Sequence, residues 1–131
     1  MMNTIISLIA AAVTFGTVLM YGTLGEVLTE RSGNLNLGVE GIMFMGGAFG
    51  LGGVFYYEQA VGEANSSAAV ALLIALASAF AAGAIASLIF SFLTITLRAN
   101  QNVTGLALTI FGTGVGQFTG EYMRVHQGGY V

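Results

Sequence analysis

Charged residues divide the chain into four long uncharged runs. These runs cover residues 1–25, 41–57, 64–97 and 99–120. A helix needs about 20 apolar residues to cross the hydrocarbon core of a bilayer, because each residue advances it by about 1.5 Å. The pattern therefore predicts an all-α integral membrane protein with about four transmembrane helices.

The predicted spans are joined by short polar segments. We place the first span at residues 4–24, the second at 37–57 and the fourth at 103–120, with the third inside the run 64–97. The third run is long enough for its helix to tilt or to extend past the bilayer. Helical propensity continues beyond the first span as far as Arg31, so we expect the first helix to end there.

The segment between the first two spans predicts an interruption of the helix. Ser32-Gly33-Asn34 is a helix stop, since Gly33 or Asn34 can adopt left-handed backbone. Asn36 can then cap the next helix by accepting from its first N–H groups. Glu40 falls in the first turns of that helix, where the helix dipole favours an anion. The second span thus follows a Gly/Asn break, which in transport proteins is where a solute is usually met.

Small residues in the later spans predict close helix packing. The second span contains Gly38, Gly41, Gly46, Gly47, Gly50, Gly52 and Gly53. The third carries a small residue at every fourth position: Ser67, Ala71, Ala75, Ala79, Gly83, Ser87 and Ser91. The fourth has Gly112, Gly116 and Gly120. We expect each row to form a helix face on which a neighbouring helix lies.

Composition excludes several classes of protein. The chain is 56% hydrophobic and 7% charged, whereas soluble domains carry about 25% charged residues. With a net charge of −3 and three arginines as its cations, it offers no basic surface for nucleic acid. It has no cysteine, no aspartate and one histidine, which excludes thiolate metal sites and argues against a metal or hydrolytic centre. We therefore predict no cofactor, no metal, no catalytic residue and no enzymatic activity.

The few charges predict an orientation in the membrane. Arg31 and Arg98 lie at connections separated by two spans, so they share a side, which is cytoplasmic by the positive-inside rule. The loop with Glu58, the polar tail and the N-terminus then face outside. Arg124 in the tail is an exception that Glu121 offsets.

Two stretches of the chain resemble one family of transporters. They are LGEVLTERSGNLNLGVEGIMFMGGAFG at residues 24–50 and LRANQNVTGLAL at residues 97–108. They look like the permease subunits of bacterial ATP-driven (ABC) importers, in the nucleoside and simple-sugar branch related to the branched-chain amino acid permeases. Members of that family are more than twice this long. The resemblance therefore implies that residues 1–131 are a single transmembrane permease domain and an N-terminal portion of a longer subunit.

The resemblance also implies a location and a set of partners. Permeases of this kind lie in the bacterial cytoplasmic (inner) membrane, in contact with lipid. They assemble with a second permease subunit, a cytoplasmic ATPase subunit and an extracytoplasmic substrate-binding protein, and none of these contacts involves nucleic acid. We expect the loop that docks the ATPase downstream of Val131. A small membrane scaffold or assembly protein, or an inactive permease fragment, is the alternative that the sequence leaves open.

Seven residues are candidates for the path of a polar solute: Asn34, Asn36, Glu40, Phe44, Gly46, Gly47 and Gln117. An ionisable residue inside a membrane is a functional candidate because burying its charge is costly. Each has a simpler role: Asn36 as a cap, Glu40 at the interface, Gly46 in helix packing and Gln117 in a hydrogen bond between helices. Phe44 and Phe49 could stack on a nucleobase or contact core and lipid.

Four charged residues are candidates for contact with the cytoplasmic partner: Glu26, Glu30, Arg31 and Arg98. Glu26 and Glu30 are four residues apart on one helix face, so they repel each other unless Arg31 or another chain neutralises them. The alternative is a solvated helix end with no partner.

Overall fold

The computed structural model describes residues 2–62 and 65–126, and this part of the chain is helical. The elements are α1 (Met2–Arg31), α2 (Val39–Val61), α3 (Ala68–Ser91), the π-helix η2 (Phe92–Thr96) and α4 (Gln101–His126). Helix α1 ends at Arg31, as the sequence predicts. The prediction of an all-α fold is confirmed.

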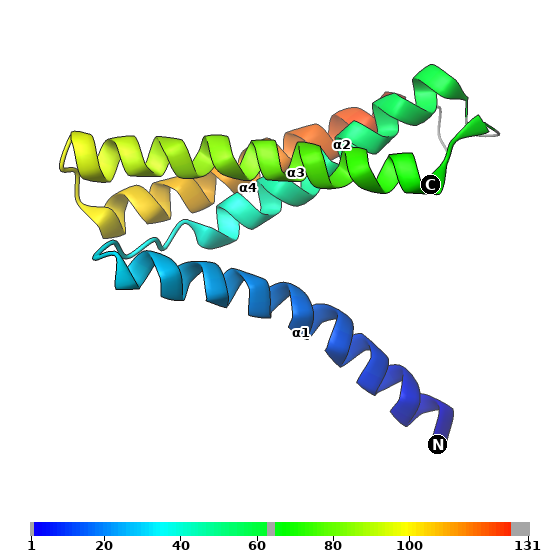
Figure 1. The fold of residues 1–131 in the computed structure, drawn as a ribbon, viewed down its shortest axis with the longest axis horizontal. Helices are drawn as coiled ribbons and strands as arrows, with labels where there is room; N and C mark the ends of the chain where they lie inside the picture. The colour runs from blue at the N-terminus through cyan, green and yellow to red at the C-terminus, as the bar shows by residue number, and fades with distance from the viewer. Residues whose placement is uncertain (1, 63–64, 127–131) are drawn as a thin grey trace.

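Helix α2 is the centre of the arrangement, because it packs against α3 on one side and α4 on another (Figure 1). α1 approaches α2 near the α1–α2 connection and then diverges from the other three helices (Figure 1). Residues 4–21 of α1 are exposed along their whole length. α1 is therefore a nearly free arm, joined to a three-helix layer at one end.

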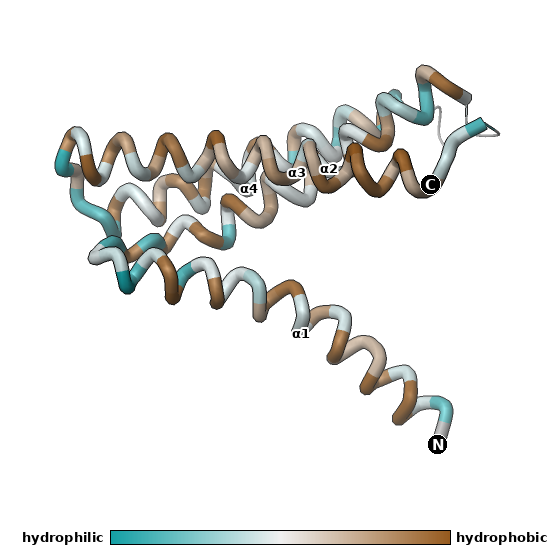
Figure 2. The backbone as a smooth tube through the Cα atoms, viewed as in Figure 1, coloured by the Kyte–Doolittle hydropathy of each residue, from teal (hydrophilic) through white to brown (hydrophobic). Residues whose placement is uncertain are grey.

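Three helices are long and apolar enough to cross a membrane. They are Asn3–Arg31, Val39–Val61 and Ala68–Thr96, and the brown segments of the backbone tube in Figure 2 mark their hydrophobic residues. α4 is equally long but is interrupted by polar and charged residues, among them Gln117, Glu121 and Arg124. The four predicted helices all form, and three of them have the composition of a spanning helix.

α2 and α4 meet backbone against backbone. A Cβ atom built on Gly112 would lie 2.5 Å from the Gly41 carbonyl oxygen and 2.8 Å from the Gly41 Cα. A Cβ on Gly41 would lie 2.6 Å from the Leu108 carbonyl oxygen and from the Thr109 Cα. No side chain fits at either position, so glycine is required on both helices.

α3 packs on α2 through part of its small-residue row. A Cβ on Gly50 would lie 3.2 Å from the Ala75 carbonyl oxygen and 3.3 Å from the Ala79 Cβ. One on Gly46 would lie 3.5 Å from the Ala79 carbonyl oxygen. The packing expected of Gly46-x-x-x-Gly50 is therefore present.

The prediction that the whole row of α3 forms one face is wrong. Ser67, Ser87 and Ser91 are exposed, and the buried residues of α3 are Ala82, Ala86 and Phe90. An α-helix has about 3.6 residues per turn, so a strict four-residue step rotates away from a straight neighbour. Contact therefore passes from the predicted row to the adjacent positions as α3 proceeds.

The connection from α3 to α4 has unusual backbone. The last turn of the helix widens into η2, where the Leu97 N–H donates to the Phe92 carbonyl oxygen at 3.1 Å. Arg98 follows with a φ of 53°, the one non-glycine residue with positive φ in the described ranges 2–62 and 65–126. A side chain in this left-handed region is strained by its Cβ.

Candidate functional site

The break between α1 and α2 forms as the sequence predicts. Gly33 adopts left-handed backbone with a φ of 88°. Its N–H donates to the Glu30 carbonyl oxygen at 2.9 Å, and the Asn34 N–H donates to the Thr29 carbonyl oxygen at 3.2 Å. These bonds satisfy carbonyl groups at the end of α1 and turn the chain toward α2.

Asn36 is buried at the centre of this break, with 7% of its surface exposed. Its Oδ1 accepts from the Gly38 N–H at 2.9 Å, which makes a local turn two residues long. The prediction that Asn36 caps the second helix is wrong in position, because α2 begins at Val39 and Gly38 is the residue that precedes it. Asn36 shapes the loop before the helix.

Gln101, at the start of α4, forms hydrogen bonds with the segment between α1 and α2. Its Oε1 accepts from the Leu35 N–H at 2.8 Å, and its Nε2 donates to the Asn34 Oδ1 at 3.1 Å. Sequence reasoning missed this residue. A polar residue just before the fourth predicted span, within the second family-like stretch, was a signal, but sequence alone does not show which loop Gln101 meets.

α4 also contacts the backbone beyond the break. Thr109 Oγ1 donates to the Leu37 carbonyl oxygen at 2.9 Å. A Cβ on Gly105 would lie 2.8 Å from the Leu37 nitrogen and 3.0 Å from the Gly38 nitrogen. The irregular backbone is thus packed against α4, which explains how it is tolerated in a membrane protein.

Glu26 joins α1 to the break. Its Oε1 accepts from the Asn36 N–H at 2.9 Å, while its Oε2 is buried without a hydrogen-bond partner. It is therefore held inside, whereas Glu30, Arg31 and Arg98, the other three residues predicted to meet a cytoplasmic partner, are exposed. The end of α1, at Arg31, and the connection between η2 and α4, which contains Arg98, lie at the same end of the bundle (Figure 1), as the predicted orientation requires.

The remaining pathway candidates lie on different sides of α2. Gly46 faces α3, as described above. Phe44 faces α4, where its ring occupies the position that a Cβ on Gly116 would take. Glu40 is exposed in the first turn of α2, and Gly47 has nothing within 4 Å of its Cβ position.

Helical spacing places Glu40, Gly47 and Glu58 along one side of α2, where Glu40 and Gly47 are exposed and Glu58 is half-buried. Gly47 and Glu58 follow Glu40 by seven and eighteen residues, which are close to two and five full helical turns. At the far end, Glu58 and Arg124 line a cavity of about 280 Å³ between α2 and α4. Gln117 is exposed and lies seven residues before Arg124, on the same side of α4. We call Glu40, Gly47, Glu58, Gln117 and Arg124 the open polar face.

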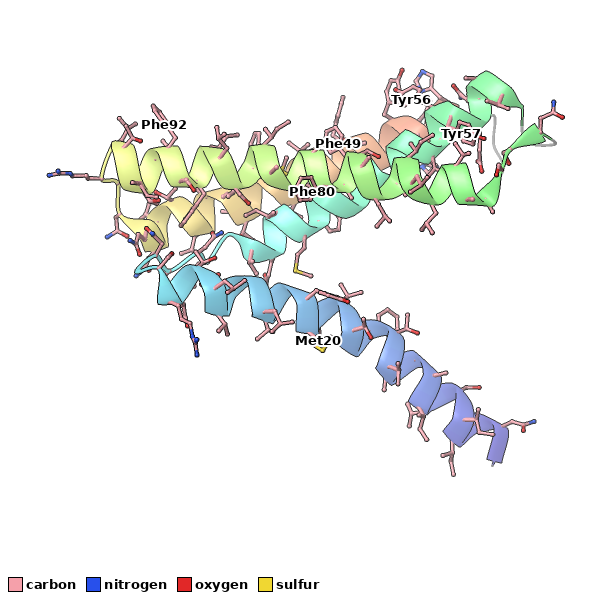
Figure 3. All side chains as sticks on the ribbon, viewed as in Figure 1. Met20, Phe49, Tyr56, Tyr57, Phe80 and Phe92 are labelled. Carbon is pink, nitrogen blue, oxygen red and sulfur yellow. The ribbon has the colours of Figure 1, made fainter. Side chains whose placement is uncertain are left out.

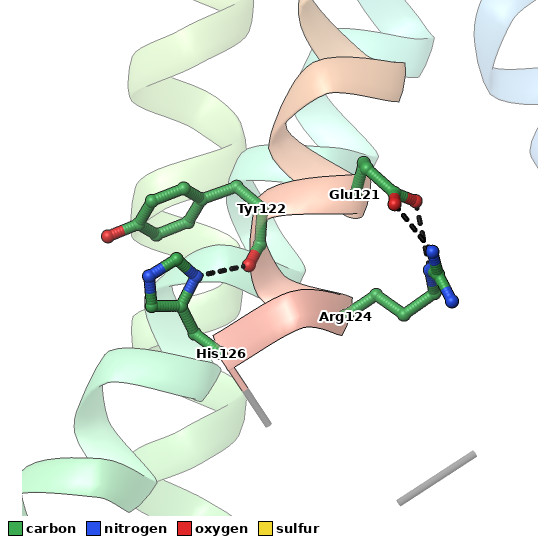
Figure 4. A network of polar contacts seen from close by, with 4 residues as sticks. All are labelled: Glu121, Tyr122, Arg124 and His126. Atoms are coloured by element: carbon green, nitrogen blue, oxygen red, sulfur yellow. Dashed lines mark hydrogen bonds and ion pairs between the residues drawn. The ribbon is translucent and has the colours of Figure 1, made fainter. Parts of the chain in front are cut away.

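At the end of α4, Arg124 forms an ion pair with Glu121, three residues earlier on the same helix (Figure 4). Arg124 Nε donates to Glu121 Oε2 at 2.9 Å, and its second nitrogen lies 2.5 Å from Glu121 Oε1. Hydrogen bonding from Arg124 lowers the pKa of the Glu121 carboxyl. The ring of His126 stacks on Tyr122 with centroids 4.0 Å apart. The expectation that Glu121 offsets Arg124 is confirmed.

The groups gathered at the break and on the open polar face are amides, hydroxyls, carboxylates and one guanidinium. Within residues 2–62 and 65–126, no three His, Cys, Asp or Glu residues come together as metal ligands. What these groups can do is form hydrogen bonds with a polar solute along a helix surface.

Three helices that are long and apolar enough to cross a membrane are typical of a multi-pass membrane protein. The family described as branched-chain amino acid transport system / permease component matches residues 7–129. The chain belongs to this family, which confirms the resemblance seen in the sequence.

Three similar proteins carry related names. A protein of Haloferax volcanii, provisionally named as the glucose ABC transporter permease TsgC13, is 40% identical over 114 residues, which are 87% of this chain and 31% of that protein. The guanosine ABC transporter permease NupQ of Bacillus subtilis is 35% identical over 85% of this chain and 33% of its own. The nucleoside ABC transporter permease NupC of Lactococcus lactis is 28% identical over 88% and 35%.

This chain spans about a third of the length of these relatives. No solved structure matches it.

Proposed function

We propose that this chain forms part of the permease subunit of an ATP-driven importer and guides a small polar solute, a nucleoside or simple sugar, across the membrane. The observation that carries the proposal is the family match over residues 7–129, together with relatives named for glucose, guanosine and nucleosides. No bond of the solute is made or broken in this role. The protein supplies a path, and an ATPase supplies the energy.

The open polar face is the best candidate for that path. Glu40 and Gln117 are exposed there and carry hydrogen-bonding groups, and Gly47 leaves backbone of α2 uncovered two turns after Glu40. Asn34 and Asn36 contribute indirectly in this proposal, because their side chains are already engaged in holding the break. Phe44 and Gly46 serve helix packing, so we no longer place them on the path.

The proposed partners follow from the family and from the charges. A cytoplasmic ATPase would meet the end of the bundle formed by the last turn of α1, with Glu30 and Arg31, and by the connection from η2 to α4, with Arg98; all three residues are exposed. A substrate-binding protein would approach from outside, and a second permease subunit would lie beside this one. We place the assembly in the bacterial inner membrane, with residues 1–131 as an N-terminal portion of the subunit and the apolar surfaces of α1 and α3 in lipid.

Uptake of labelled guanosine and glucose by the full assembly tests this proposal. We expect Glu40→Gln and Gln117→Leu each to lower the uptake rate at least fivefold, because each removes a hydrogen-bonding or charged group from the path. Asn102→Ala is the control, since Asn102 is exposed at the start of α4 and lies off the open polar face. Unchanged uptake in both variants would remove this face from the path, and no uptake by the wild type would contradict the permease role for these solutes.

A further inference from the structure

The first helix and the second helix leave the sides that face each other largely uncovered. Within residues 2–62 and 65–126, α1 comes close to α2 and to no other helix. The two helices meet at Gly22, where an added Cβ would lie 2.5 Å from the Met43 sulfur. From this contact toward its N-terminus, α1 diverges from the other three helices (Figure 1).

Helical spacing identifies the uncovered side of α1. Val18 and Phe15 precede Gly22 by four and seven residues, which are about one and two helical turns, so they lie on the side of α1 that begins at the contact with α2. Their side chains are 54% and 71% exposed. Two large apolar side chains are therefore directed toward the space beside α2 and are not covered by it.

α2 has an uncovered side of its own beyond the same contact. Gly47 and Leu51 follow Met43 by four and eight residues, about one and two turns, and both are exposed. The space around the Cβ position of Gly47 is open to 4 Å, so another helix could approach the backbone of α2 closely there. We call the four uncovered positions the α1–α2 surface: Phe15, Val18, Gly47 and Leu51.

The α1–α2 surface borders the open polar face of α2. Gly47 belongs to both, and Glu40 lies two turns before it. An ionisable side chain in a membrane protein usually faces other protein or a water-filled path, because contact with hydrocarbon is costly. Lipid would also leave the open position at Gly47 without the close helix packing that such a residue permits. Protein is therefore a better cover for this surface than lipid.

The length and the direction of the chain select one protein segment as that cover. The residues aligned with the Haloferax volcanii relative are 31% of that protein, so more than two-thirds of it lies outside the alignment. Helix α4 ends at the end of the bundle where α1 is farthest from the other helices (Figure 1). A chain that continues from α4 starts beside the open end of the α1–α2 surface. A helix of another subunit would have to insert between two helices of this one.

We propose that a membrane helix from the remaining length of the same subunit packs on the α1–α2 surface. This inference rests on the proposed function, in which residues 1–131 are an N-terminal portion of a permease subunit. The helix would contact Phe15 and Val18 on α1 and would approach α2 most closely at Gly47. It would also form a wall of the solute path, opposite the open polar face of α2.

Photocrosslinking of the full-length subunit, within its assembly and in membranes, tests this inference. The photoreactive amino acid p-benzoylphenylalanine is placed at Phe15 on α1 or at Leu51 on α2, both of which are exposed. We expect both positions to crosslink within the same polypeptide, to one helix beyond residue 131. Met20 is the control, because it is exposed and points away from the other three helices in Figure 3. The reagent at Met20 should give at least tenfold less product with that helix.

Mass spectrometry of the crosslinked peptides separates the outcomes. Products from Phe15 and Leu51 that share one helix beyond residue 131 support the proposal. Products with another subunit, products with lipid alone, or products confined to residues 1–131 overturn it, and so does an equal yield from Met20. Uptake of labelled guanosine and glucose is measured on the same wild-type assembly without irradiation. Failure of that uptake would count against the proposed function, whatever the crosslinks show.

Discussion

Glycine at single positions decides how closely the helices approach. Gly41 and Gly112 place two backbones in contact, whereas Gly114, on the same helix as Gly112, faces open space. The sequence predicted close packing from these rows, and the structure confirms it for Gly112 and Gly116 but not for Gly120, which has nothing within 4 Å. Composition identifies a glycine-rich helix, but only the register between helices shows which glycine is needed.

Gly112→Ala should destabilise the protein. Its Cβ would lie 2.5–2.8 Å from the Gly41 backbone, which cannot move as a flexible side chain could. Overpacking of this kind costs about 1–3 kcal/mol. We expect a lower midpoint of thermal unfolding for the full-length subunit in detergent. Gly114→Ala is the matched control and should be neutral or slightly stabilising, because alanine favours helix; equal midpoints for the two variants would contradict the contact.

Gln101→Leu should destabilise the segment 32–38 between α1 and α2. It leaves the Leu35 N–H and the Asn34 side chain without their partner, and an unsatisfied, partly buried N–H costs about 1–2 kcal/mol. Gln101→Glu keeps an acceptor for Leu35 and loses the donor to Asn34, so its effect should be smaller. Hydrogen exchange at the Leu35 amide measures this directly. The neighbouring Asn102→Leu, at an exposed position, should leave that exchange rate unchanged.

At the level of elements, the helices themselves were predictable and their contacts were not. Uncharged runs located the four helices, and Gly33 located the break. The detachment of α1 was not predicted, because an apolar sequence is the same whether it faces lipid or another helix. The role of Glu26 was also missed, since pairing between residues ten positions apart across a loop has no periodic signal.

Glu26→Ala should widen the range of angles at which α1 leaves the bundle. Glu26 makes the hydrogen bond between α1 and the backbone of Asn36, and few other contacts hold the arm. Spin labels at Ile9 on α1 and Leu73 on α3 would report a broader distance distribution in the variant. Glu30→Ala, one turn later and exposed, is the control. A narrow, unchanged distribution in Glu26→Ala would show that α1 is held by other means.

Arg98→Gly should affect the stability of the protein and its coupling to the ATPase in different ways. The φ of 53° costs an L-residue about 1–2 kcal/mol, which glycine avoids. Part of that gain is offset by the greater freedom of glycine in the unfolded chain. We expect an unfolding midpoint equal to or above that of the wild type, with lower solute-stimulated ATP hydrolysis if Arg98 meets the ATPase as proposed. Unchanged ATP hydrolysis would remove Arg98 from that contact.

For the whole molecule, the sequence predicted the class and the ends of the bundle, since charge and hydropathy act over entire spans. It did not predict which residues of α2 are exposed and which are covered, because this depends on where α3 and α4 pack against α2. The clearest case is the cavity lined by Phe49, Tyr56, Phe118 and Tyr122, because these rings come from α2 and α4, which are separated in the sequence by the whole of α3.

Orientation is testable across the whole molecule, because these 131 residues contain no cysteine. A cysteine at Ser32 or Asn100 should react with a membrane-impermeant thiol reagent only after the cytoplasmic side is opened. A cysteine at Gln59 should react in intact cells. All three positions are exposed. Reaction of Gln59→Cys only from the cytoplasmic side would show that the predicted orientation is inverted.

The backbone contacts of α2 also limit how the protein can change shape. α2 lies backbone to backbone with α4 at Gly41 and Gly112 and close to α3 at Gly50 and Ala75, so a rotation that turned a larger α2 side chain toward either neighbour would cause a collision. We therefore expect α2, α3 and α4 to move together as one unit when the protein changes shape. Motion within this part of the chain would then be concentrated near Glu26, where α1 changes its angle to the other three helices.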